Sequence, residues 1–231
     1  MDVQQVELAD GTTISAQVWG EAGGPPLVLL HGLGEQASTW DEVAPQLATR
    51  FRVVALDLRG HGSSTWAGPY SFTLMRDDVL GVLGALGLDD VVLVGHSMGG
   101  VVAYLVAQAQ PARVARLVIE DVPPPFARER PLPERPEGEL PFDWAVVPAI
   151  AEEVNDPSRQ WWDHLPDITA PTLVIGGGAT SHIPQELLAD VCAAVPDCTL
   201  ITIDAGHDVH EVEPDAFARA VLDWLGEDFG G

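Results

Sequence analysis

Short apolar runs separated by helical patterns make up most of the chain after residue 26. In these runs successive positions are apolar, not alternate ones, which is typical of strands covered on both faces. Six segments have this pattern: Leu27–Leu30, Val53–Leu56, Val91–Val94, Leu117–Ile119, Thr172–Ile175 and Leu200–Ile203. Between them apolar residues recur at steps of three and four, for example from Phe72 to Leu86 and from Phe217 to Trp224. This alternation predicts an α/β fold with a mainly parallel twisted sheet and helices on both faces.

The first nineteen residues follow a different pattern. Val3–Leu8 and Thr12–Trp19 alternate between apolar and polar positions, and Asp10-Gly11 lies between them. Asp-Gly between two alternating runs is a strong signal for a hairpin turn. We therefore expect an N-terminal antiparallel hairpin beside the parallel strands.

Residues 122–169 separate two predicted strands by more than one crossover helix requires. Seven prolines between Val122 and Pro141 exclude a long helix there. A long insertion in a compact domain is usually functional or disordered, and we interpret this one as a lid inserted before the last two strands. The predicted organisation is an α/β core, residues 1–121 and 170–231, with a lid insertion at 122–169.

The negative charge of the chain disfavours anionic binding partners. Its 231 residues include 35 acidic side chains and 11 basic ones, which gives a formal net charge of −24. Such a field repels phosphate backbones and anionic lipid, so we expect no nucleic acid and no membrane as partner, but a small-molecule substrate. All the basic residues are Arg, which excludes cofactors that need a lysine amine. The sequence does not indicate an oligomeric state.

The sequence also favours a cytoplasmic protein. It begins without the basic and apolar regions of a signal peptide, and no apolar stretch reaches the roughly 20 residues of a membrane span. Cys192 and Cys198 make neither a disulfide framework nor a metal signature, so we expect two unpaired cysteines in a reducing compartment. No acidic or histidine residues have metal-ligand spacing, and we expect no cofactor and no metal.

The strongest chemical signal is Gly95-His96-Ser97-Met98-Gly99, which lies between a buried strand and an Ala/Val-rich helix. In a G-x-S-x-G turn the glycines allow strand and helix to approach closely. The serine hydroxyl then projects into a cleft at the helix N-terminus, where backbone N–H groups favour developing negative charge. This context predicts Ser97 as a nucleophile.

Together with three further motifs, this turn resembles the α/β-hydrolase superfamily, in its serine-nucleophile, esterase- and lactonase-like branch. The motifs are His31-Gly32-Leu33-Gly34, Asp57-Leu58-Arg59-Gly60-His61-Gly62-Ser63-Ser64 and Gly206-His207. The resemblance implies His207 as the catalytic base and the backbone N–H groups of Leu33 and Met98 as the oxyanion hole.

The other histidines have simpler explanations. His31 and His61 fit turn-stabilising roles in their loop motifs, and His210 is expected to pack beside His207. His96 adjoins Ser97, but neighbours on such a turn point apart.

The acid departs from the commonest pattern of the superfamily. That pattern places Asp in the loop after Thr172–Ile175, but residues 176–184 contain no carboxylate. Some members carry the acid one strand earlier, where this sequence has Glu120 and Asp121. We predict Asp121 as the acid that orients the histidine. Glu120, Asp204 and a serine–histidine pair without an acid remain alternatives.

The predicted activity is hydrolysis of a carboxylic ester, lactone or thioester of a small to medium apolar substrate through an acyl-enzyme. Trp40, Phe126 and Trp144 are candidate substrate-binding residues. Carbon–carbon bond hydrolysis and cofactor-free perhydrolysis would use the same site. A non-catalytic small-molecule-binding protein would keep only the pocket, but it would not require both Ser97 and His207.

Overall fold

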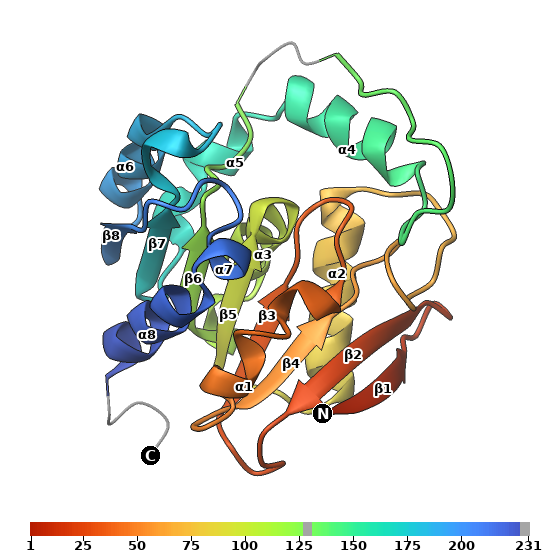
Figure 1. The fold of residues 1–231 in the computed structure, drawn as a ribbon, viewed down its shortest axis with the longest axis horizontal. Helices are drawn as coiled ribbons and strands as arrows, with labels where there is room; N and C mark the ends of the chain where they lie inside the picture. Colours follow the sequence, from red (N-terminus) through yellow and green to blue (C-terminus); the bar gives the residue numbers. More distant parts are fainter. Residues whose placement is uncertain (127–130, 227–231) are drawn as a thin grey trace.

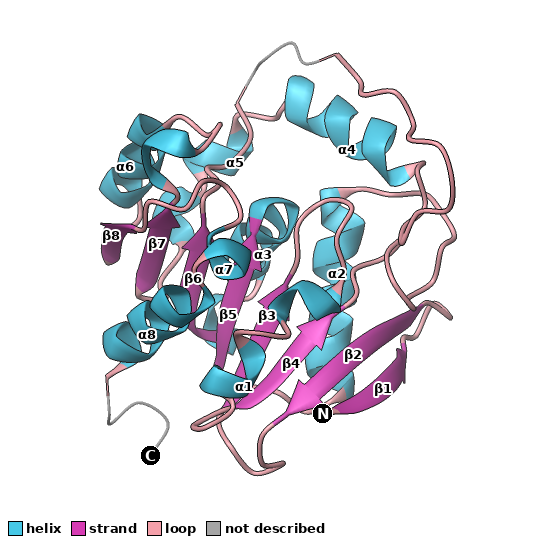
Figure 2. Cartoon of the chain, viewed as in Figure 1, coloured by secondary structure: helices cyan, strands magenta, loops and turns pink. Residues whose placement is uncertain are grey.

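A single mixed sheet forms the centre of the molecule in the computed structural model, which describes residues 1–126 and 131–226. Within these ranges eight strands have the order β1-β2-β4-β3-β5-β6-β7-β8 (Figure 2). The strands are β1 (Asp2–Glu7), β2 (Thr13–Trp19), β3 (Pro26–Leu30), β4 (Arg52–Leu56), β5 (Val91–His96), β6 (Val114–Glu120), β7 (Thr172–Gly176) and β8 (Cys198–Thr202). β1 and β2 form the predicted antiparallel hairpin, and β3 to β8 pair in parallel. The predicted lid and core also include residues 127–130 and 227–231, which lie outside the described residues.

Helices cover both faces of the sheet. They are α1 (Ala44–Leu47), α2 (Phe72–Ala85), α3 (Ser97–Ala109), α4 (Val146–Asn155), α5 (Gln160–Asp163), α6 (Gln185–Ala194), α7 (Val209–Val212) and α8 (Pro214–Leu225). Apolar residues of α2, α3 and α6 belong to one core cluster, and those of α1, α7 and α8 to another. Figure 1 shows these helices around the sheet. No helix of the described chain is both long enough and apolar enough to span a bilayer.

Strand β3 shows how the sheet separates the two clusters. Val28 and Leu30 pack in the first cluster, whereas Leu27 and Leu29 pack in the second. All four side chains are fully buried. The uninterrupted apolar runs therefore arise because successive side chains enter opposite cores, as predicted.

The prediction that Leu200–Ile203 is covered on both faces is wrong. The strand there is β8, which lies at the edge of the sheet, and Leu200 is 38% exposed. Among the described strands, β7 alone pairs with it, over Cys198–Thr202. Its apolar residues are therefore those of a partly exposed edge strand.

The segment between β6 and β7 leaves the sheet and crosses the carboxyl ends of its strands. It contains α4 and α5, and α4 lies above α2 and α3 in the view of Figure 1. Residues 122–126 and 131–141 contain no helix, in agreement with the prolines there.

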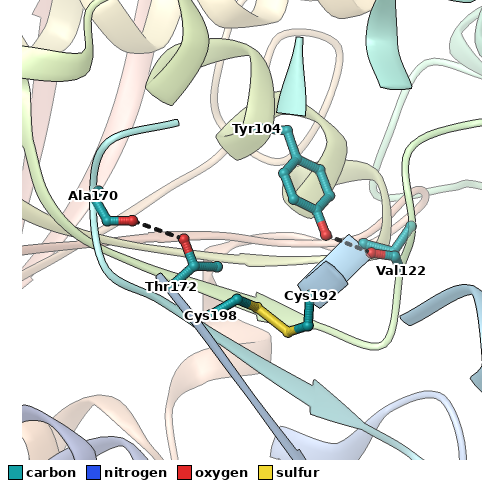
Figure 3. The surroundings of a disulfide bond; sticks show 6 residues. All are labelled: Tyr104, Val122, Ala170, Thr172, Cys192 and Cys198. Atoms are coloured by element: carbon teal, nitrogen blue, oxygen red, sulfur yellow. Dashed lines mark hydrogen bonds between the residues drawn. A yellow bond between two sulfur atoms is a disulfide. The ribbon is translucent and has the colours of Figure 1, made fainter. Parts of the chain in front are cut away.

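A disulfide joins Cys192 to Cys198, so the prediction of two unpaired cysteines is wrong (Figure 3). Cys192 lies near the end of α6, and Cys198 begins β8. The chain reverses direction between these two elements, which brings the two Cα atoms to 5.0 Å. The six-residue spacing thus reflects a tight helix-to-strand connection. The bond removes the support that unpaired cysteines gave to a reducing compartment.

A buried ion pair connects α2 to the loop after β4. The Arg59 guanidinium donates to Asp78 from Nε at 2.7 Å and from a terminal nitrogen at 2.5 Å. Both side chains are almost fully buried. A second carboxylate, that of Asp10 in the hairpin turn, lies 3.5 Å from the same guanidinium. Arg59 therefore fixes the hairpin and α2 relative to the loop that contains it.

We expect Asp78→Asn to lower the free energy of unfolding by about 3 kcal/mol, because it leaves a buried guanidinium without its main counter-ion. Denaturant titration measures this loss. Asp77→Asn is the matched control, since Asp77 is exposed and its ion pair with Arg76 lies on the surface. The control is expected to stay within about 0.5 kcal/mol of the wild type. Equal losses in both variants would contradict the role of the buried pair.

Candidate active site

Ser97 lies on a tight turn between β5 and α3. Its backbone has φ of +49°, a left-handed conformation that is strained for a residue with a side chain. A Cβ atom at Gly95 would lie 2.4 Å from the Gly99 carbonyl oxygen, and one at Gly99 would lie 2.4 Å from that of Leu30. The two glycines thus allow the close approach of strand and helix that the G-x-S-x-G spacing predicts.

The structure brings together Ser97, His207 and Asp121. Nε2 of His207 lies 2.9 Å from Oγ of Ser97, and Nδ1 lies 2.9 Å from Oδ2 of Asp121. His207 is in the loop between β8 and α7, after Gly206, which has φ of +85°. Serine, imidazole and carboxylate therefore form one continuous line of hydrogen bonds. This is the geometry in which the imidazole can accept the serine proton.

Asp121 directly follows β6, is fully buried and has φ of +46°. Its carboxylate also accepts hydrogen bonds from the backbone N–H of Gly177 at 2.7 Å, from Nε2 of Gln185 at 2.9 Å and from the Ser181 hydroxyl. Burial alone would raise the pKa of Asp121, but these donors and His207 hold it below its usual value. The carboxylate is therefore ionised at neutral pH.

Two of the alternative acids lie elsewhere. Glu120 binds His210: it accepts a hydrogen bond from the backbone N–H of that residue at 2.8 Å and from Nδ1 of its ring at 2.9 Å. Asp204 is exposed. Nδ1 of His207 faces Asp121, so geometry favours Asp121 over both.

His31 and His61 stabilise loops, as predicted. Nδ1 of His31 donates to the carbonyl of Gly32, and its Nε2 accepts the N–H of Leu58 at 3.0 Å. Burial lowers the pKa of His31 to about 3, so the ring is neutral. His61 accepts the N–H of Gly34 at 3.2 Å, and burial also lowers its pKa. Both rings therefore support the loop that contains Leu33.

The sequence did not single out three residues of the loop after β7 and the start of α6. Ser181 and Gln185 donate to Asp121, and the ring of His182 lies 4.3 Å from that of His207. A search of that loop for a carboxylate misses them, because they supply donors to an acid on the neighbouring strand. The useful signal would have been hydroxyl and amide side chains in a loop that lacks its usual acid.

An apolar cavity of about 280 Å³ opens beside Ser97. Leu33 and Met98, the residues predicted to supply the oxyanion hole, line it together with Ser97. Met98 is the second residue of α3, so its backbone N–H has no partner within the helix. Among the described residues, the polar side chains in the wall are those of Ser97, Asn155 and His182.

Of the three aromatic residues predicted to bind substrate, the structure places only Phe126 in the cavity wall. Trp40 is fully buried on the other face of the sheet, where it stacks on His210 with ring centroids 3.9 Å apart. Trp144 packs beside Phe142, outside the lining. The prediction failed for Trp40 because the sequence alone does not indicate which face of the sheet this residue packs against. It failed for Trp144 because its contact with Phe142 depends on how the segment between β6 and β7 folds.

Glu35, His96 and His210 offer side-chain atoms within 4.8 Å of one another. His96 is hydrogen-bonded to Glu35, and His210 to Glu120, so these side chains already have partners within the fold. We assign no metal to this cluster.

Comparison with known proteins agrees with the α/β-hydrolase fold. The family described as alpha/beta hydrolase fold matches residues 25–139. The chain is 28% identical to the magnesium-chelatase 30 kDa subunit of Rhodobacter capsulatus, over 89% of this chain and 88% of that one. It is 27% identical to a putative esterase/lipase of Haemophilus influenzae, over 87% and 83% of the two chains. A hydrolase from Pseudomonas aeruginosa has a similar structure, with a TM-score of 0.85, 26% identity and coverage of 97% and 98%.

We expect Asp121→Asn to slow covalent labelling of Ser97 by a fluorophosphonate by a factor on the order of 10⁴, because the amide no longer holds the histidine in its reactive tautomer. Mass spectrometry of the labelled peptide measures the rate. Asp204→Asn is the control, because it removes an exposed carboxylate from the loop that contains His207. It should leave the labelling rate unchanged. If Asp204→Asn lowered the labelling rate strongly and Asp121→Asn lowered it only slightly, the acid would be Asp204 and not Asp121.

Proposed function

The chain belongs to the α/β-hydrolase superfamily, and from this premise we propose that it is a serine hydrolase cleaving a carboxylic ester, lactone or thioester through an acyl-enzyme. The observation that carries the proposal is the hydrogen-bonded line Ser97–His207–Asp121 at the mouth of an apolar cavity. The likeness to a putative esterase/lipase supports the ester class.

In the first half-reaction His207 acts as general base. Its Nε2 takes the proton of Ser97 Oγ while the oxygen attacks the substrate carbonyl carbon. The carbonyl oxygen becomes an oxyanion that accepts hydrogen bonds from the backbone N–H groups of Leu33 and Met98. His207 then gives its proton to the leaving alcohol or thiol, and the acyl group remains on Ser97.

In the second half-reaction water replaces the leaving group. His207 takes a proton from water, the hydroxide attacks the acyl carbon, and the serine oxygen recovers its proton from His207. Asp121 stabilises the imidazolium that forms in each half-reaction and holds its Nδ1–H.

The cavity favours an apolar, uncharged group. Its described wall contains no Asp, Glu or Arg side chain, and its volume suits a small to medium acyl or alcohol part. The net charge of −24 disfavours highly anionic substrates. We therefore propose neutral apolar esters as the substrate class.

The test is turnover of p-nitrophenyl esters from acetate to laurate by wild-type protein and Ser97→Ala. We expect the wild type to hydrolyse them and the variant to lose activity by a factor on the order of 10⁴ or more, with its fold intact by circular dichroism. Retained activity in Ser97→Ala would refute the nucleophile assignment. An inactive wild type whose Ser97 also resists fluorophosphonate would refute the hydrolase proposal.

We also expect Ile150→Trp to shift the preferred ester toward shorter acyl chains. Ile150 is a buried residue of α4 that lines the cavity, so a larger side chain there fills space the substrate would use. The ratio of kcat/KM for butyrate to that for laurate measures the shift. Val3→Trp is the control, because Val3 is exposed on β1. An unchanged ratio in Ile150→Trp would show that the acyl chain binds elsewhere.

A further inference from the structure

His96, the residue before Ser97, is fully buried, and both of its ring nitrogens face hydrogen-bond acceptors. Nδ1 lies 3.4 Å from Oε2 of Glu35. Nε2 lies 3.2 Å from the backbone carbonyl oxygen of His207 and 3.6 Å from Oδ1 of Asp208. A neutral imidazole has one N–H and would satisfy only one side. These surroundings fit an imidazolium that donates from both nitrogens.

The Glu35 end of this contact reaches the loop that contains Leu33. Oε2 of Glu35 accepts the backbone N–H of Gly32 at 2.8 Å. A Cβ atom at Gly32 would lie 2.7 Å from Oε1 of Glu35 and 2.9 Å from Nδ1 of His96. The pair therefore packs directly against the backbone just before Leu33, one of the two proposed oxyanion donors.

We propose that Glu35 and His96 form an ionic bridge that holds the oxyanion loop and the loop of the catalytic histidine at a fixed separation. One end is the N–H of Gly32, and the other is the carbonyl of His207. Glu35 and His96 are positioning residues, because neither lines the cavity and the Ser97 hydroxyl is hydrogen-bonded to His207. Their effect on catalysis rests on the proposed hydrolase function, but the bridge itself does not.

The charges around His96 support its protonated form. The titratable groups that face it from the neighbouring strands, loops and helix α7 are Glu35, Glu120, Asp208, Glu211, His31, His207 and His210. Burial alone would lower the pKa of His96, but Glu120, Glu35 and Asp208 raise it to about 9. For the carboxyl of Glu35 the effects are reversed: burial alone would raise its pKa, but His96 and the Gly32 N–H lower it to about 2.

The sign of the pH dependence follows from these directions. The pKa of His96 is raised above its usual value of 6.5 and that of Glu35 is lowered below its usual value of 4.5, so the bridge stabilises the fold fully between these two pH values. This contribution is lost as pH rises through about 9, where His96 gives up its proton. Oxyanion donors and base are then no longer held together, and reactivity at Ser97 should fall at alkaline pH.

The test compares Glu35→Gln, which removes the charge but keeps the shape, with Glu42→Gln, an exposed site on the same stretch. The rate of fluorophosphonate labelling at Ser97 is measured from neutral to alkaline pH. In Glu35→Gln we expect the rate to fall by about 10- to 100-fold and its alkaline decline to move to lower pH, because small misplacements of catalytic groups cost that much. Glu42→Gln should match the wild type.

A second measurement detects the ionic bridge independently of catalysis, through the protonation state of His96. Nitrogen NMR of the wild type should show both ring nitrogens of His96 protonated at neutral pH, the signal being assigned by its absence in His96→Gln. Glu35→Asp keeps the charge, so both His96 ring nitrogens should stay protonated at neutral pH. In Glu35→Gln we expect His96 to lose its proton at a lower pH than in the wild type, closer to neutral.

A neutral His96 ring in the wild type would overturn the bridge. A charged ring, with folded Glu35→Gln labelled at the wild-type rate and with the same pH profile, would overturn its positioning role. If no variant is labelled, the wild type included, the hydrolase proposal fails, and the NMR result still decides whether the ionic bridge exists.

Discussion

The parallel register between β5 and β6 is the constraint on which the candidate site depends. It pairs His96 with Glu120, so the next residues of the two strands, Ser97 and Asp121, leave the sheet side by side. Both have a positive φ, which turns each chain sharply at the strand end. Because Ser97 and Asp121 are neighbours, the single ring of His207 can contact the hydroxyl and the carboxylate at the same time. A shift of one residue in this register would separate nucleophile and acid.

The position of the acid changes the role of its neighbouring strand. Because the carboxylate comes from β6, the loop after β7 supplies hydrogen-bond donors to it in place of an acid of its own. Gly177, Ser181 and Gln185 surround Asp121 in this way. The carboxylate can be fully buried and still ionised, since burial is offset by several donors. The same offset operates between Glu35 and His96, whose ring contacts the backbone carbonyl of His207.

Much of the fold could be predicted from the sequence, because strand burial on two faces and helix amphipathicity leave local patterns. The nucleophile turn is also local, since its glycines and serine lie within five residues. Contacts between distant segments leave no such pattern. The buried position of Trp40, the donors around Asp121 and the Cys192–Cys198 bond each depend on how separate elements meet. Edge strand β8 was predicted as a strand but not as an exposed one, because its apolar residues resemble those of a central strand.

Most of the cavity wall comes from residues 122–155, between β6 and β7, whereas the proposed nucleophile, base and oxyanion loop come from other strand ends. Recognition and chemistry are thus encoded in separate stretches of the chain. Replacement of one continuous block of sequence would alter what fits beside Ser97 and leave the reacting groups in place. A fold organised in this way can acquire new substrates in evolution through a single insertion, while its reaction stays the same.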